Sequence, residues 1–147
     1  MERIALTELE ELTLNNRSKS FLRETSKWAF FLSILGFIGI GLMIILGVFA
    51  GAIFNNMPNA ENLPFDMATA MSTFYLVMAL IYFFPVYYLL MFSRKMKSAL
   101  LTKNNDTLSD AFELLKSHYK FMGVFTIIIL SLYLLGIIVS LLGIALA

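Results

Sequence analysis

Residues 81–95 read IYFFPVYYLLMFSRK, an apolar and aromatic run that ends abruptly in two cations. Aromatic rings followed by positive charge are typical of the place where a transmembrane helix leaves the lipid. The same run holds Pro85, which lacks a backbone donor and predicts a bend in a helix. This stretch therefore predicts a membrane span that ends near residue 92.

Three stretches contain no Asp, Glu, Lys, Arg or His: residues 28–54, 67–92 and 121–147. Each is about 26 residues long, and about 20 apolar residues are enough to cross the hydrocarbon core of a bilayer. The composition agrees, because 59% of the chain is hydrophobic and only 14% is charged. We expect an all-α integral membrane protein with three transmembrane helices.

The distribution of charge predicts the orientation of these helices. Five of the eleven Lys and Arg residues precede residue 28, and the other six lie within 93–120. The loop 55–66 has none and carries two carboxylates. Cytoplasmic loops are enriched in Lys and Arg, so we expect the N-terminus and 93–120 inside, and 55–66 and the C-terminus outside.

The segments outside the lipid have different characters. Residues 1–27 read as a cytoplasmic amphipathic lead-in, in which Thr7 and Glu10 match a capping box. Residues 55–66 are a short outer loop with Asn and Pro. We expect no folded receptor domain from a loop of this length.

Residues 93–120 are expected to form a cytoplasmic helical hairpin. The second helix continues to about Leu101, and the polar run 104–106 predicts a turn. Thr107 with Asp110 predicts the cap of a third helix that continues into the last span.

Small residues recur at helical spacing on the first and third spans. Lipid provides no hydrophobic drive for helix association, so helices in membranes pack through small residues. Whether they pack within the chain or against another chain is open at this point. The candidate helix-packing residues are Ala29, Ser33, Gly36, Gly39, Gly47, Gly51, Gly136, Ser140 and Gly143.

Two further groups stand out. Tyr75, Tyr82 and Pro85 form a candidate kink or cavity in the second span, as either a static bend or a hinge. The rings and cations at the inner boundary are candidate lipid-headgroup anchors. The anchors are Lys27, Trp28, Arg94, Lys95, Lys97, Tyr119 and Lys120.

The sequence contains no known catalytic motif. There is no cysteine, His118 is the only histidine, and no span carries an ionisable group of the kind that marks proton and ion paths. We expect no enzymatic activity, no cofactor or metal, and no nucleic-acid binding.

Three stretches together carry a family resemblance: SKSFLRETSKWAFFLSILGFIG (18–39), YFFPVYYLLMFSRKMKSAL (82–100) and AFELLKSHYKFMGVFTIIILSLY (111–133). They resemble an uncharacterised family of small bacterial inner-membrane proteins, a domain of unknown function. The resemblance implies a multi-pass protein of the bacterial inner (cytoplasmic) membrane, and it implies no activity.

Two hypotheses of function follow. The first is a non-enzymatic accessory or scaffold subunit of an inner-membrane complex, because the chain is small and has stripes of small residues. The second is a small homo-oligomeric channel or transporter for neutral or apolar solutes, with Tyr75 and Tyr82 along the path. The expected partners are membrane lipids and either other transmembrane subunits or a second copy.

Overall fold

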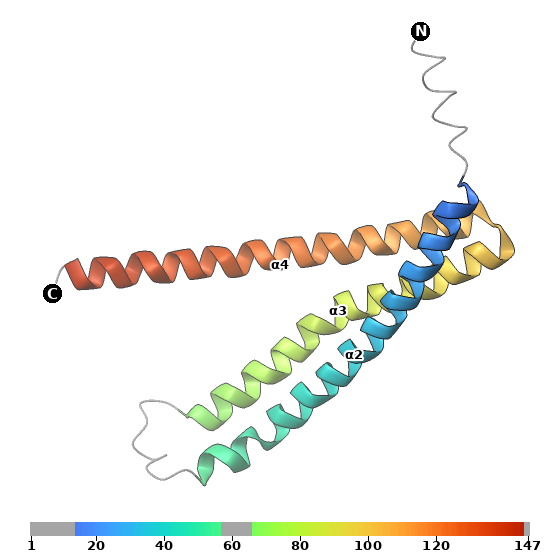
Figure 1. Ribbon diagram of the computed structural model, residues 1–147. Coiled ribbons are helices and arrows are strands. Elements are labelled where there is room, and N and C mark those ends of the chain that lie inside the picture. Colours follow the sequence, from blue (N-terminus) through green and yellow to red (C-terminus); the bar gives the residue numbers. More distant parts are fainter. Residues whose placement is uncertain (1–13, 57–65, 146–147) are drawn as a thin grey trace.

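The computed structural model describes residues 14–56 and 66–145, and the described chain consists of three long helices (Figure 1). Helix α2 runs over Asn16–Asn55, α3 over Met67–Thr102 and α4 over Asn105–Ala145. All three are long and apolar enough to cross a membrane. The prediction of an all-α protein with three candidate spans is therefore confirmed. The capping box at Thr7 and Glu10 lies outside the described residues.

The first two helices begin at side-chain caps. The Asn15 side chain accepts a hydrogen bond of 2.7 Å from the amide of Ser18 at the start of α2. At the start of α3, Asp66 accepts from the Thr69 amide at 3.1 Å and from the Thr69 hydroxyl at 2.6 Å. The Thr69 hydroxyl and then the Thr69 amide hold the pKa of the Asp66 carboxyl below its ordinary value. Such caps satisfy amides that a helix leaves free at its N-terminus.

The turn between α3 and α4 is only two residues long. Lys103 ends α3 in the left-handed conformation, with φ 54° and ψ 38°. Asn104 then caps α4, because its side chain accepts a 3.0 Å hydrogen bond from the amide of Thr107. The predicted cap at Thr107 and Asp110 was wrong: α4 begins earlier, and Asp110 forms an ion pair with Lys95 at 2.8 Å.

Helices α2 and α3 form an antiparallel pair that is in contact along its length (Figure 1). The fully buried positions of α2, together with the half-buried Gly36 and Met43, follow one another at spacings of three and four residues, which is the heptad spacing of a coiled-coil seam. The α2 seam residues are Ser26, Ala29, Ser33, Gly36, Ile40, Met43, Gly47 and Ala50. Most of them are small, so the two backbones approach closely.

The tightest packing lies at the end of the molecule that holds the α3–α4 turn. Phe92 and Met96 of α3 are fully buried there, between Ala29 of α2 and Ala111 of α4. All three helices contribute to this cluster, whereas α2 and α4 have little contact elsewhere. The core therefore lies where the spans end and the predicted hairpin begins.

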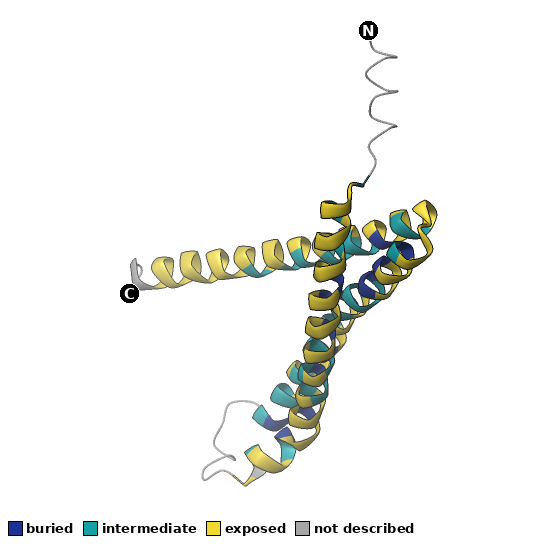
Figure 2. Ribbon diagram, turned by 45° about the vertical axis from the view of Figure 1, so that its right-hand side comes forward, coloured by how far each residue is buried: buried dark blue, intermediate teal, exposed yellow. Residues whose placement is uncertain are grey.

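Helix α4 diverges from the other two beyond this core (Figure 1). The ring of Phe125 still contacts Tyr82 of α3, with centroids 6.0 Å apart. Every residue from 130 to 143 is exposed (Figure 2). The molecule is thus a V, with the α2–α3 pair as one arm and α4 as the other.

Candidate functional site

The small residues of α2 pack within the chain, against α3. A Cβ atom added at Gly36 would lie 2.7 Å from Cγ2 of Val86, and one at Gly47 would lie 3.0 Å from Cγ of Leu76. The distance at Gly36 is shorter than real Cβ contacts, so a side chain there would force a neighbour to move, whereas the contact at Gly47 is tight. Ala29 and Ser33 are buried in the same seam.

Two hydrogen bonds fix the ends of the α2–α3 seam. The Ser72 hydroxyl donates to the carbonyl oxygen of Gly47 at 2.6 Å, and the Ser93 hydroxyl donates to the carbonyl oxygen of Ser26 at 2.8 Å. Hydroxyl groups that bond across helices are a common means of association in membranes.

Two of the candidate packing residues on α2 lie beside the seam. A Cβ atom added at Gly39 or Gly51 would meet nothing within 4 Å. The seam repeats every 3.5 residues, so it includes Gly36, Ile40, Gly47 and Ala50 but skips residues 39 and 51. Gly39 and Gly51 are one position off this repeat, although they share the broader face of a straight helix.

The candidate packing residues on α4 have no partner among the described residues. Gly136, Ser140 and Gly143 are all exposed, and a Cβ atom at either glycine would meet nothing within 4 Å. Gly136 and Ser140 form the floor of a shallow notch between larger side chains. The notch, which we call the α4 notch, is lined by Leu132, Tyr133, Gly136, Ile137, Ser140 and Leu141.

Tyr75 and Tyr82 do not face a common space. The Cβ of Tyr75 faces Gly47 of α2, whereas the ring of Tyr82 meets Phe125 of α4. Pro85 is buried inside α3, which continues through it without a break. These residues therefore belong to two separate helix contacts.

The carbonyl oxygen of Pro85 is bonded to the histidine of α4. Nδ1 of His118 lies 2.8 Å from this oxygen and donates to it when the ring carries its proton on Nδ1. The pair joins α3 to α4 close to the point where the arms of the V separate. The sequence does not predict this contact, because the pairing depends on the register of the two helices.

The candidate headgroup anchors gather around the turn end of the molecule. Trp28 is 59% exposed and Tyr119 is 66% exposed, so both rings are free to reach lipid. Lys95 differs from the other cations because it pairs with Asp110. Lys120 lies on α4, in a groove beside Tyr88 of α3.

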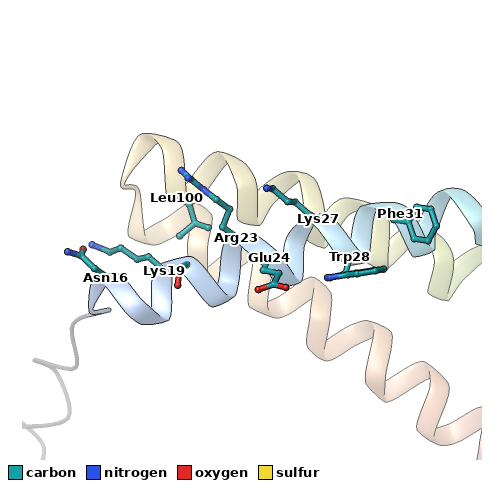
Figure 3. A pocket seen from close by; sticks show the side chains of 9 residues that line it. Asn16, Lys19, Arg23, Glu24, Lys27, Trp28, Phe31 and Leu100 are labelled. Atoms are coloured by element: carbon teal, nitrogen blue, oxygen red, sulfur yellow. The ribbon is translucent and has the colours of Figure 1, made fainter.

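Three of the candidate anchors line one hollow with Arg23, a residue that was not among the predicted anchors. Lys27, Arg94 and Lys97 line a hollow between α2 and α3, together with Arg23. We call this hollow, which also includes Leu100, the basic groove. Figure 3 shows a neighbouring hollow on α2, which Arg23, Lys27 and Leu100 also line, together with Lys19 and Glu24. The spacing of four residues between Arg23 and Lys27 was the signal that places both on one helix face.

The described residues hold no group of three His, Asp or Glu side chains that could bind a metal ion. No family model, curated protein or solved structure matches the chain. The resemblance to the bacterial inner-membrane family stays a prediction.

Proposed function

We propose that this protein is a non-enzymatic accessory or scaffold subunit of a bacterial inner-membrane complex, and that α4 binds a transmembrane helix of a partner subunit. In this proposal the N-terminus and the α3–α4 turn lie in the cytoplasm. The charge distribution supports this orientation, because the cations of the described chain lie at the turn end of the helices.

The observation that carries the proposal is the exposure of residues 130–143. The α2–α3 pair satisfies its own small residues, since Gly36 and Gly47 face side chains of α3. The α4 notch offers the same kind of surface, but no described helix enters it. Because small residues let helices approach closely, the open notch fits a helix from another chain.

The geometry gives less support to a channel or transporter lined by Tyr75 and Tyr82. The two side chains contact different helices of the same chain, so they do not line one path. We therefore favour the subunit over the channel.

The test is cross-linking in native membranes. A photoreactive amino acid at Ser140 is expected to join the chain to one discrete protein, which mass spectrometry identifies. The double variant Gly136→Leu/Ser140→Leu fills the notch and is expected to abolish co-purification of that protein. Gly123→Leu is the matched control, because Gly123 is also open and lies on a different face of α4.

The outcomes separate the alternatives. Adducts only with lipid, or equal loss of the partner in the Gly123→Leu control, would contradict the proposal. Adducts only between two copies of this chain would replace the partner subunit by self-association.

A further inference from the structure

The basic groove gathers four positive charges from two helices. Arg23 and Lys27 of α2 and Arg94 and Lys97 of α3 line this hollow of about 450 Å³. Within the part of the chain that the structure describes, none of its lining residues is acidic. The one ion pair among the described residues involves Lys95, which points elsewhere.

The close approach of the two helices brings these cations together. The buried hydrogen bond between the Ser93 hydroxyl and the Ser26 carbonyl lies at the floor of the groove. Ser26 and Ser93 are each 4% exposed, so little separates the two backbones at this level. Long cationic side chains from both helices therefore reach the same space.

A bound anion would relieve the repulsion between these cations. Like charges four residues apart on a helix destabilise it, and Arg23 and Lys27 have this spacing. Apolar side chains border the same hollow, among them Phe30 on the membrane side and Leu101 near the turn. Positive charge above apolar surface, at the end of a span, matches a negatively charged headgroup above its acyl chains.

We infer that the basic groove binds one phospholipid whose headgroup carries two phosphates, the chemistry of cardiolipin. Each helix supplies one arginine, whose guanidinium matches the oxygens of a phosphate, and one lysine as a point charge. Two such pairs suit two linked phosphates better than one. Basic pockets between transmembrane helices at the cytoplasmic side are a known setting for such headgroups. The inference does not rest on the partner proposed for α4, since it concerns a site within one chain.

The experiment uses the full chain, purified in a neutral detergent and freed of lipid. Native mass spectrometry then measures the binding of cardiolipin, phosphatidylglycerol and phosphatidylcholine. One cardiolipin per chain is expected to bind, more tightly than phosphatidylglycerol, and phosphatidylcholine is expected not to bind. Removing one cation pair, in Arg23→Gln/Lys27→Gln or Arg94→Gln/Lys97→Gln, is expected to weaken cardiolipin binding about thirtyfold.

Lys103→Gln/Lys116→Gln is the matched control, because it removes two cations that lie outside the groove and are not among the candidate headgroup anchors. The control is expected to keep its affinity for cardiolipin, and circular dichroism checks that each variant stays helical. Equal binding of phosphatidylglycerol and cardiolipin to the unmodified chain would overturn the two-phosphate site without any variant. An equal loss of affinity in the control would show that total charge, rather than the groove, holds the lipid.

Discussion

At the level of single residues, two glycines allow α2 and α3 to pack closely, because their missing side chains leave room for α3. Gly36 is the tighter of the two, because Cγ2 and Cγ1 of Val86 lie 2.7 Å and 2.9 Å from the position of a Cβ atom. Valine is branched at Cβ and has little rotamer freedom in a helix, so it cannot move aside easily. A single methyl group at this position is therefore expected to force the helices apart.

The variant Gly36→Ala is expected to lower the free energy of unfolding by about 1–3 kcal/mol, the usual cost of overpacking a close contact. Gly39→Ala is the control, because its added methyl group meets nothing within 4 Å and alanine is the better helix former. Thermal unfolding in detergent, followed by circular dichroism, compares the two. Equal melting temperatures for both variants would contradict a close seam at Gly36.

At the scale of elements, the contact between α3 and α4 decides how far the V opens. Among the described residues, the two helices share the Lys95–Asp110 ion pair, the aromatic contacts and the bond from His118 to Pro85. The ion pair is exposed and is therefore weak. The bond from His118 joins a side chain of α4 to the backbone of α3 and is expected to limit the motion of α4.

His118→Leu removes this donor and is expected to widen the distribution of α3–α4 distances, since a lost hydrogen bond of about 1 kcal/mol changes a two-state ratio roughly fivefold. His118→Asn keeps a donor at the position of Nδ1 and is expected to behave like the unmodified chain. The chain has no cysteine, so spin labels can be placed at Leu80 and Leu134, which are both exposed. Identical distance distributions for the two variants would contradict a restraint at His118.

The elements themselves could be predicted from the sequence, but their contacts could not. Length and hydropathy were enough to find three helices, and a turn near Asn104 followed from the polar residues there. The small-residue stripe on α2 includes Gly36 and Gly47, which the structure places against side chains of α3. It also included Gly39 and Gly51, because a broad face at 3.6 residues per turn does not resolve a seam that repeats every 3.5.

The contacts that join different helices depend on their register, which no local pattern reveals. The spacing of Arg23 and Lys27 places them on one face, but it does not place Arg94 and Lys97 opposite them. In the same way, nothing near His118 in the sequence identifies the carbonyl group of Pro85 as its partner. The separation of α4 from the other helices likewise depends on contacts between helices and not on any local pattern in the sequence.

At the scale of the whole molecule, the two ends differ in charge and in packing. The buried cluster of Phe92, Met96 and Ala111 lies at the end that also carries the cations. At the other end the α2–α3 pair and α4 are apart (Figure 1). If the cations stay in the cytoplasm, the packed end lies inside and the open end of the V lies toward the outer face.

Cysteine labelling in intact cells tests this orientation, since the natural chain contains no cysteine. Asn56→Cys, at the exposed end of α2, is expected to react with a membrane-impermeant maleimide. Thr102→Cys, next to the α3–α4 turn, is expected to react only after the membrane is permeabilised. The reverse pattern, or equal reaction at both positions, would contradict the orientation predicted from charge.

The separation of α4 from the α2–α3 pair also has a consequence for biosynthesis. Chains emerge from the ribosome N-terminus first, and early segments can fold before later ones are made. Beyond the buried cluster that Ala111 shares, the seam between α2 and α3 involves only these two helices, so most of this hairpin can assemble while α4 is still being translated. Residues 130–143 follow this hairpin, and their exposed side chains are available to whichever neighbour is synthesised alongside.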